Sequence, residues 1–430
     1  MIEQEIRTQA EAAKAASYAL AARRTDVRNA ALEAMADALM EHTDAILHEN
    51  AADVSEAKEA GMRASYIDRL HLDAERVASM AEGLRLTAAL PDPLGREDYS
   101  VRRPNGLEIR RMRVPLGVIG MIYEARPNVT ADAIGLCLKS GNAVVLRGGS
   151  DALRSNRAIA EVLSRAAYAA GIPSGAVQLL AMKDRSAVDV MTHLTGLLDV
   201  LIPRGGAGLI RRIVENSSVP VIETGAGVCH VYVDRSADVP MALQIVRNAK
   251  VSRPSVCNAA ETLLVHEAIA EEFLPQIADL LRADGVKLRG CERTRAILTG
   301  IAAASEEDWA AEYGDLILAI RTVKDIDAAL AHINRYNTGH SEAIVTNDIR
   351  AAHDFQQRAD ASTIYVNAST RFTDGFEFGF GAEIGISTQK LHVRGPMGLD
   401  ALTSTKYLVY GEGQVREAVP AAQKIHECGV

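Results

Sequence analysis

The feature that most constrains this chain is a long alternation of short apolar segments with amphipathic helical segments, from about residue 114 to about residue 386. Short strands that alternate with helices form parallel sheets, because each parallel pair needs a long crossover connection. The crossover helices then cover both faces of the sheet. We therefore expect an α/β fold with parallel-sheet cores.

The alternation falls into two blocks. In the first, strands are expected at residues 118–122, 143–147, 177–182, 198–203 and 219–224, and helices at 131–139, 154–170, 186–194 and 207–216. In the second, strands are expected at residues 231–234, 262–266, 316–323, 342–346 and 363–367. Because 430 residues exceed one compact core, the two blocks predict two α/β/α domains.

Two segments flank this alternation. Residues 1–90 show apolar positions at helical spacing and are expected to be helical. Residues 99–113 are rich in arginine and contain Asn105-Gly106, which indicates a hairpin turn. A final strand at 405–411 is expected to pair with that hairpin. Together they predict a small β element at an edge or a subunit contact.

Composition and charge exclude several classes of protein. The net charge of −9 argues against nonspecific nucleic-acid binding and against a basic membrane-surface patch. The sequence shows no signal peptide and no apolar run near the ~20 residues of a membrane span. We expect a cytoplasmic protein that binds neither membranes nor nucleic acids.

The cysteines and histidines limit the chemistry further. The cysteines are Cys137, Cys229, Cys257, Cys291 and Cys428, an odd set without a CxxC pair. This argues against a disulfide framework and a structural zinc site. The histidines show no HExxH motif, so no metal site is expected.

Cys257 stands in a polar loop with Pro254, between an expected helix at 242–250 and the strand at 262–266. Glu223 precedes it at an expected strand end and is followed by Gly225 and Gly227. A cysteine on a loop with an acid and flexible backbone nearby is typical of a thiol nucleophile. The alternative interpretation is that Cys257 is merely one of several small hydrophobic side chains.

Further candidates follow other strands, where open parallel sheets bind ligands. They are Arg147, Gly148, Gly149 and Ser150 after one strand, and Gly205 and Gly206 after another. The glycines allow backbone to approach a phosphate, Arg147 can hold one, and the helix after Gly206 offers its amides. Plain turn geometry explains each cluster as well, and the GxGxxG fingerprint is absent.

Three more features have two interpretations each. Asn128 is either an oxyanion donor or the cap of the following helix. Glu312 is either functional or a solvated surface residue. The aromatic, acidic and glycine-rich segment 376–386 is either a loop that covers a small-molecule site or a structural loop.

In this order, the motifs resemble the aldehyde dehydrogenase superfamily. The resemblance rests on residues 115–120, Asn128, residues 141–147, Glu223 with its glycines, Cys257, Glu312 and residues 339–341. Segments 123–128, 253–261 and 378–398 resemble the gamma-glutamyl phosphate reductase family within it. That family implies NADPH-dependent reduction of glutamyl 5-phosphate to glutamate 5-semialdehyde in proline biosynthesis, with release of phosphate from a cysteine thioester.

The resemblance also implies roles for individual residues. Cys257 matches the nucleophile, and Asn128 matches the asparagine that shares the oxyanion hole with the Cys257 amide. Arg147 replaces the lysine that contacts the adenosine ribose, and Glu312 matches the glutamate that contacts the nicotinamide ribose. Glu223 matches the general base of hydrolytic aldehyde dehydrogenases.

The sequence departs from the superfamily pattern at three positions. The base motif reads Glu-Thr-Gly-Ala-Gly, so a catalytic role for Glu223 is doubtful in a reductase. Ser150 stands where NAD-dependent members often carry an acid, which with Arg147 favours NADP(H). Arg126 or Arg371 is a candidate to hold the substrate's α-carboxylate.

The implied architecture has three parts. The NADP(H)-binding domain comprises residues 1–97 and 114–227, the catalytic domain 228–390, and an oligomerisation element 98–113 with 395–415. A homodimer or homotetramer is expected, and a separate glutamate 5-kinase is the expected source of the substrate. The alternatives are a hydrolytic NAD(P)-dependent aldehyde dehydrogenase and a non-catalytic homologue.

Overall fold

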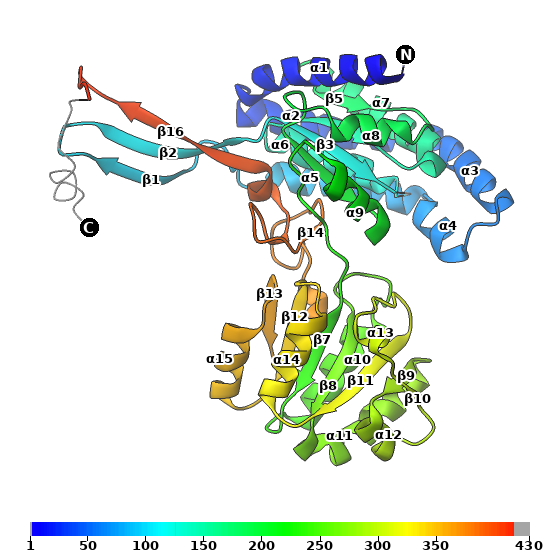
Figure 1. Ribbon diagram of the computed structural model, residues 1–430. Coiled ribbons are helices and arrows are strands. Elements are labelled where there is room, and N and C mark those ends of the chain that lie inside the picture. Colours follow the sequence, from blue (N-terminus) through cyan, green and yellow to red (C-terminus); the bar gives the residue numbers. More distant parts are fainter. Residues whose placement is uncertain (1, 125, 417–430) are drawn as a thin grey trace. The chain divides into compact units, whose positions relative to one another are not determined.

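The structure is a computed structural model that describes residues 2–124 and 126–416. These residues form two compact units (Figure 1). Unit 1 contains the described residues up to Gly120, those from 126 to Val200, and those from Leu399 onward. Unit 2 contains Met121–Glu124 and Leu201–Gly398. Cys428 lies outside the described residues.

Helices make up most of unit 1. They are α1 (Ile2–Ala21), α2 (Thr25–Glu41), α3 (Thr43–Glu59), α4 (Ala64–Leu70), α5 (Ala74–Ala89), α6 (Asn128–Lys139), α7 (Leu153–Ala169) and α8 (Ser186–Thr192), with the 3₁₀ turns η1 (Ser150–Ala152) and η3 (Leu399–Leu402). In α2, Leu32, Met35 and Leu39 are fully buried. Their spacing places them on one helical face. The helices expected in residues 1–90 are confirmed.

A four-stranded sheet has the order β5-β4-β3-β6. Its strands are β3 (Val118–Tyr123), β4 (Ala143–Arg147), β5 (Val177–Leu179) and β6 (Val200–Arg204). β3 and β4 are buried along their whole length, which explains why they are apolar apart from Arg147 at the end of β4. β4 and β5 pair in parallel. Four of the five strands expected in this block are confirmed, although β5 ends three residues earlier than expected.

Unit 2 contains a seven-stranded sheet with the order β10-β9-β11-β8-β7-β12-β13, and every neighbouring pair is parallel. Its strands are β7 (Cys229–Val233), β8 (Ala260–His266), β9 (Lys287–Gly290), β10 (Ala302–Ala303), β11 (Ile317–Val323), β12 (Ser341–Val345) and β13 (Thr363–Val366). A short antiparallel pair joins β14 (Ile386–Ser387) and β15 (Gly395–Pro396).

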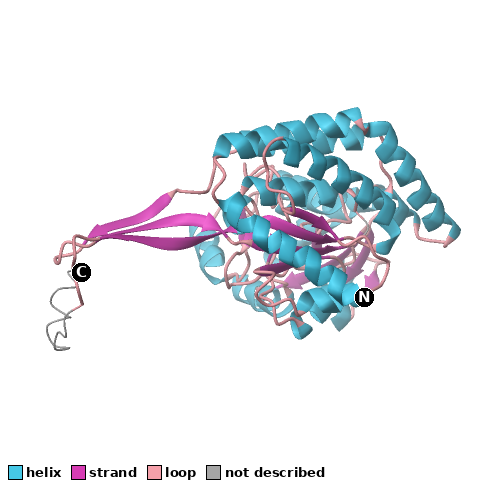
Figure 2. Ribbon diagram, turned by 90° about the horizontal axis from the view of Figure 1, so that it is seen from above, coloured by secondary structure: helices cyan, strands magenta, loops and turns pink. Residues whose placement is uncertain are grey.

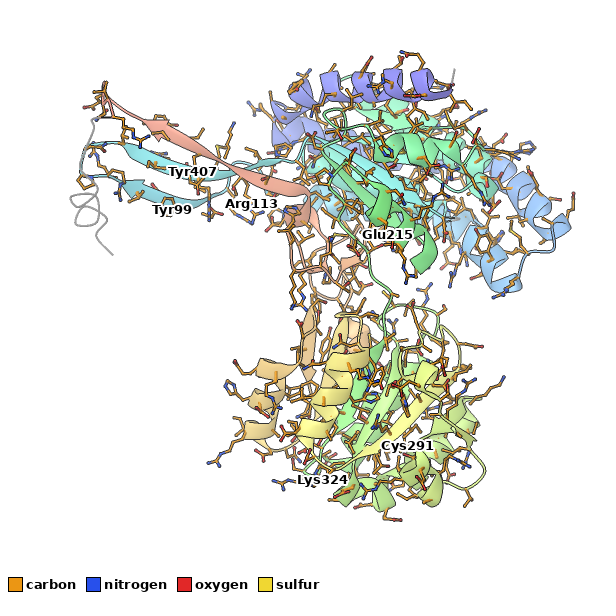
Figure 3. The ribbon with its side chains drawn as sticks, viewed as in Figure 1. Tyr99, Arg113, Glu215, Cys291, Lys324 and Tyr407 are labelled. Carbon is orange, nitrogen blue, oxygen red and sulfur yellow. The ribbon has the colours of Figure 1, made fainter. Side chains whose placement is uncertain are left out.

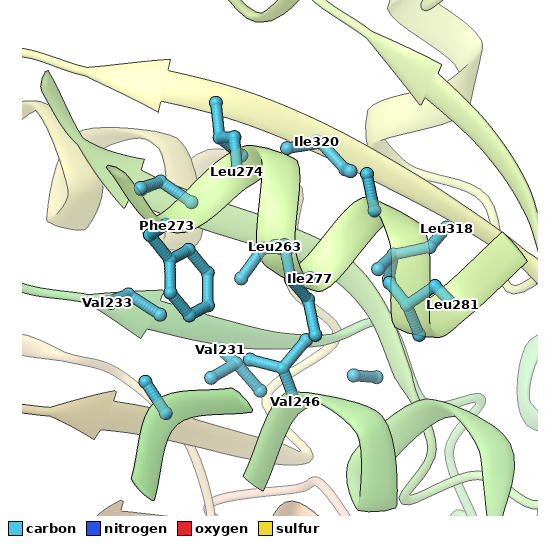
Figure 4. Close-up of a cluster of buried hydrophobic side chains, with 14 of the residues drawn as sticks. Val231, Val233, Val246, Leu263, Phe273, Leu274, Ile277, Leu281, Leu318 and Ile320 are labelled. Atoms are coloured by element: carbon cyan, nitrogen blue, oxygen red, sulfur yellow. The ribbon is translucent and has the colours of Figure 1, made fainter. Parts of the chain in front are cut away.

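The helices of unit 2 connect these strands, except for the first helix, which precedes β7. They are α9 (Ala207–Asn216), α10 (Val239–Val251), α11 (Glu267–Ala283), α12 (Glu292–Ile297), α13 (Glu306–Trp309), α14 (Ile326–Tyr336) and α15 (Ile349–Arg358), with the 3₁₀ turn η2 (Thr370–Phe372). On one side of the sheet, Phe273 and Ile277 of α11 pack in a fully buried cluster with Leu263 of β8 (Figure 4). The predicted α/β fold with parallel-sheet cores is confirmed.

The strand expected at residues 219–224 is wrong. This segment makes only an isolated bridge between Leu201 and Val221. Pro220 has no backbone N–H to donate, and the Glu223 N–H donates to the side chain of Gln389 at 2.8 Å. The segment therefore leaves the sheet after one bridge and turns towards other loops of unit 2.

The small β element is an antiparallel sheet with the order β1-β2-β16, formed by β1 (Glu97–Arg102), β2 (Glu108–Pro115) and β16 (Thr403–Tyr410). It projects away from the helices of unit 1 (Figures 1 and 2). Gly106, at φ 89°, supplies the left-handed turn residue. The expected pairing of the C-terminal strand with the hairpin is confirmed.

The projecting sheet exposes aromatic side chains. Tyr99 is 48% exposed and Tyr407 is 59% exposed, and Figure 3 shows both on the strands of this sheet.

Among the described residues, no helix combines the length and the apolar character that crossing a membrane requires.

Candidate active site

Cys257 lies in the loop between α10 and β8, as expected. The Asp238 side chain caps the start of α10 by accepting from the Met241 N–H, and the helix ends at Val251. Cys257 is half-buried, whereas Cys137 and Cys229 are fully buried. The Cys257 thiol is therefore partly accessible on a loop, unlike the thiols of the two core cysteines.

The glycine-rich segment after Glu223 lies directly against this loop. A Cβ atom on Gly227 would stand 1.5 Å from the Cys257 carbonyl oxygen and 2.9 Å from its Cα. Both contacts are with backbone, which no rotamer change can relieve. The Cys229 thiol donates to the same carbonyl oxygen at 3.3 Å. Only glycine at 227 allows the two segments to approach in this way.

Glu312 joins this arrangement from the loop before β11. Its side chain is exposed, but its Oε1 accepts a hydrogen bond from the Gly227 N–H at 3.0 Å. The surface interpretation of Glu312 is therefore incomplete. Unit 2 brings together Cys257, Gly227 and Glu312, three parts of the predicted constellation.

Glu223 is held by a side chain that the sequence did not single out. Gln389 Nε2 donates to Glu223 Oε1 at 3.1 Å, while Gln389 Oε1 accepts from the Glu223 N–H at 2.8 Å. Nearby, the Gly225 N–H donates to the Ile386 carbonyl at 3.2 Å. The segment expected to cover a site thus contacts the glutamate motif through its C-terminal end. The aromatic, acidic and glycine-rich composition of residues 376–386 is the only sequence signal nearby, and it ends just before Gln389.

Charges around Cys257 act in opposite directions. Burial, followed by the negative charge of Glu383, raises the pKa of Cys257 to about 11, and Glu312 adds to the increase. Arg204 opposes it. The Arg204 guanidinium donates to the Ile384 carbonyl, so the cation is fixed beside the segment that carries Glu383. The thiol is therefore mostly protonated at pH 7.

Arg371 lies beside the same loop. Its Nε donates to Ser252 Oγ at 3.0 Å, and its Nη1 contacts Asn258 Oδ1. Burial, followed by the positive charge of Arg253, lowers the pKa of Arg371. Two guanidinium groups, those of Arg204 and Arg371, therefore lie near Cys257 together with the carboxylates of Glu383 and Glu312.

The start of α9 already holds an anionic group. The Gly206 N–H donates to Glu124 Oε2 at 3.0 Å, and a Cβ on Gly205 would stand 2.8 Å from the Glu124 carboxyl carbon. The turn therefore offers a backbone N–H to an anionic side chain, and its contact with a cofactor stays a prediction. Its partner here is a carboxylate that the sequence analysis had not singled out.

Unit 1 holds the remaining candidates. α6 begins at Asn128, its N-cap is Pro127, and no side chain caps it. The capping interpretation of Asn128 is therefore wrong, because its exposed side chain donates to Asp132 Oδ2 at 3.2 Å, one turn further on. Arg126 is half-buried just before this helix. The proximity of Asn128 to Cys257 stays a prediction.

Arg147 ends β4 and is largely buried. Its Nη1 donates to the Gly148 carbonyl at 2.9 Å and its Nη2 to the Asp184 carbonyl at 3.4 Å. Ser150 is half-buried and donates to Asp151 Oδ1 at 3.3 Å. The acidic residue Asp151 therefore directly follows Ser150, the position at which NAD-dependent members often carry an acid. The ligand of this cluster stays a prediction.

Within residues 2–124 and 126–416, no three His, Cys, Asp or Glu side chains are grouped so that they could hold a metal ion. The candidate site therefore consists of a thiol, carboxylates, guanidinium groups and backbone amides.

Comparisons with known proteins show the family and the fold of the chain. The profile of the aldehyde dehydrogenase family matches residues 2–289 and 309–407. A gamma-glutamyl phosphate reductase of Moorella thermoacetica is 60% identical over 96% of this chain and 99% of its own length. The one from Halothermothrix orenii is 57% identical over 97% of this chain and 100% of its own length.

Solved structures show the same relationship. The gamma-glutamyl phosphate reductase of Thermotoga maritima superposes with a TM-score of 0.94 at 49% identity, covering 96% of this chain and 100% of that one. An acetylating aldehyde dehydrogenase of Geobacillus thermoglucosidasius has a TM-score of 0.68 at 19% identity, with 97% and 98% covered. The second similarity shows the fold alone.

We expect Gly227→Ala to lower the free energy of unfolding by about 1–3 kcal/mol, because its Cβ forces two backbone segments apart. Gly208→Ala is the matched control, since no atom lies within 4 Å of a Cβ built at that position of α9. Denaturant unfolding measures both. Equal stabilities of the two variants would contradict the contact with Cys257.

We expect opposite changes in Cys257 reactivity when its charged neighbours are neutralised. Glu383→Gln should lower the pKa of Cys257 and speed its alkylation by iodoacetamide at pH 8.5 by about 3–10-fold, because more thiolate is present. Arg204→Gln should slow it. Mass spectrometry of the Cys257 peptide measures the rate, and Glu377→Gln in the same exposed loop is the control.

Proposed function

Because the chain belongs to the aldehyde dehydrogenase family, and within it to the gamma-glutamyl phosphate reductases, we propose that it reduces glutamyl 5-phosphate to glutamate 5-semialdehyde and phosphate through a thioester on Cys257. The observation that carries the proposal is the half-buried Cys257 loop packed against Gly227 and tied to Glu312. Such a loop presents a thiol and fixes its backbone, as acyl transfer requires.

The proposed reaction has two stages. The Cys257 thiolate attacks the acyl carbon, a sulfur–carbon bond forms, and the bond to phosphate oxygen breaks. A nicotinamide cofactor, when bound, would supply the hydride that reduces the thioester. The resulting oxyanion on carbon collapses to the aldehyde and returns the electron pair to the Cys257 sulfur. We propose the Cys257 N–H and the Asn128 side chain as oxyanion donors, which typically contribute about 10²–10³-fold in rate each.

The residues fit an anionic cofactor. At Gly206 the Glu124 carboxylate stands where a phosphate oxygen would accept the same N–H, so this turn binds anions. We propose that Gly205 and Gly206 contact the cofactor's phosphates, that Arg147, Gly148, Gly149 and Ser150 contact its adenosine end, and that Glu223 and Glu312 lie at its nicotinamide end. Arg147 and Ser150 favour NADP(H), although Asp151 lies next to Ser150.

The hydrolytic alternative requires Glu223 to activate water. Its carboxylate instead accepts from Gln389 Nε2 at 3.1 Å, and the amide opposes a role as free base. The acyl group is therefore proposed to pass between Cys257 and phosphate, not to water.

The substrate supply, the compartment and the assembly of the enzyme follow from the same proposal. The acyl phosphate is labile, so a separate kinase of the glutamate 5-kinase type supplies it, and the enzyme works in the cytoplasm. We propose that the projecting sheet of β1, β2 and β16 joins subunits of a homodimer or homotetramer, which its exposed Tyr99 and Tyr407 support.

The reverse reaction tests the function. We expect the protein, NADP and glutamate 5-semialdehyde to give reduced cofactor only when phosphate is present, and Cys257→Ala to abolish the reaction. Absorbance of the reduced cofactor measures it. Phosphate-independent reduction would establish the hydrolytic alternative, and equal efficiency with NAD would contradict the preference for NADP.

The substrate's α-carboxylate is proposed to bind Arg371 or Arg126. We expect alanine at the correct position to raise the KM for the semialdehyde about 10–100-fold, since hydrogen bonds to charged groups contribute about 1.5–3 kcal/mol. Arg247→Ala on the exposed face of α10 is the control. Unchanged KM values in both Arg371→Ala and Arg126→Ala would exclude this assignment.

A further inference from the structure

A buried ion pair closes the base of the Cys257 loop. Lys250, near the end of α10, and Glu261, near the start of β8, flank the loop on either side. Lys250 Nζ and Glu261 Oε2 are 2.6 Å apart, and neither side chain is exposed. A buried ion pair seldom stabilises more than an apolar pair of the same size, because both charges lose hydration. Stability alone therefore does not account for these two charges.

The second oxygen of Glu261 reaches another loop. Glu261 Oε1 accepts from the Gly314 N–H at 3.2 Å. Lys250 Nζ lies 5.9 Å from the centre of the Tyr313 ring, on the same loop. Glu261 thus uses one oxygen for the cation and the other for the segment that contains Glu312.

That segment leads back to the thiol. Glu312 Oε1 accepts from the Gly227 N–H at 3.0 Å, and the Gly227 backbone lies against the carbonyl of Cys257. The contacts therefore run from Glu261 through Gly314, Glu312 and Gly227 to Cys257. The loop itself connects Cys257 back to Lys250 and Glu261 along the chain.

We propose that Glu261, paired with Lys250, is a positioning residue that fixes the Glu312 loop and, through Gly227, the backbone of Cys257. The proposal deepens the function given above and rests on Cys257 being the nucleophile. Because Glu261 touches neither substrate nor the reacting atoms, its effect is on the placement of groups that do.

The charge on Lys250 has a separate part in this arrangement. Burial raises the pKa of Glu261 to about 7, and Lys250 opposes that shift. The pKa of about 7 includes the effect of Lys250, so the cation limits the increase that burial causes and favours the ionised form, in which both oxygens are acceptors.

Two double variants isolate the hydrogen bond to Gly314. Lys250→Met with Glu261→Gln removes both charges but keeps an acceptor oxygen. Lys250→Met with Glu261→Leu removes the charges and the acceptor. Neither leaves an unpaired buried charge, so both are expected to fold. If the leucine variant does not fold, Glu261→Asp alone keeps the charge and draws the oxygen away from Gly314.

The primary measurement is the pH dependence of Cys257 alkylation by iodoacetamide. We expect the midpoint to stay near 11 in the wild type and the glutamine variant. In the leucine or aspartate variant it should fall by at least about one unit, towards the ordinary value of about 8.5 for a solvated thiol. In the reverse reaction, the same variant should lose about tenfold in kcat and raise the KM for NADP, because Glu312 is displaced.

A matched control separates positioning from general loss of stability. His230 in β7 and Glu342 in β12 form another pair without exposed surface, with Nδ1 and Oε2 3.0 Å apart. Glu342→Leu should lower stability and leave the alkylation midpoint in place. A leucine variant at 261 that keeps the wild-type midpoint and kcat, or a midpoint that shifts equally in the control, would overturn the proposal.

The readouts also separate this proposal from the function. Alkylation needs no substrate, so a wild type without phosphate-dependent turnover, but with the expected difference between variants, would reject only the proposed reaction. Normal turnover in the wild type with identical alkylation in both double variants would reject only the positioning role.

Discussion

The contact between the Gly227 backbone and the Cys257 carbonyl constrains the rest of unit 2. Nothing larger than hydrogen fits between them, since a Cβ would stand 1.5 Å from that oxygen. Three loops from different parts of the sequence must therefore converge there, carrying Glu223, Cys257 and Glu312. The parallel sheet makes this possible, because the three loops lead into β7, β8 and β11, whose amino-terminal ends lie at the same edge of the sheet. At this point the loops are held together by close backbone contact, whereas segments elsewhere in the core are held together by side-chain packing.

Charge at the thiol is balanced between neighbours of opposite sign. Burial and two carboxylates hold the proton on Cys257, and Arg204 acts against them. A cysteine that is protonated when the site is at rest is less open to oxidation than a free thiolate, because the thiolate is the reactive form. The Cys257 thiol is thus held in a fixed place while it is protonated, and a ligand that alters the local electric field would change its protonation state.

Periodicity predicted most of the fold because the strands and helices are strongly patterned. β3 and β4 are apolar apart from the final Arg147 of β4, and α2 has its buried apolar residues on one face. The failure at residues 219–224 has a physical cause: the segment has strand-like composition, but Pro220 and the Gln389 side chain take away its pairing. Short strands such as β10, only Ala302–Ala303, have too few residues to show a period.

The candidate site was predicted unevenly for a related reason. Cys257, Glu223 and Glu312 occur in motifs with a recognisable order, so sequence alone singled them out. Gln389, Glu124 and Glu261 act through partners more than fifty residues away in the chain or through buried charge, and local pattern carries no trace of such partners. Asn128 shows the opposite error, because cap preference is a local rule and the helix begins on that residue.

The pairing of β16 with β2 also sets an order for the folding of the chain. Thr403 is opposite Pro115, so unit 1 cannot complete its projecting sheet until the whole of unit 2 has been synthesised. Almost all of unit 2 is the single segment Leu201–Gly398, so the internal contacts of unit 2 form before β16 is synthesised. During translation the hairpin of β1 and β2 therefore waits with an unpaired edge, which is a template for pairing with other chains. Ribosomes that stall late in the message would leave that edge open for longest.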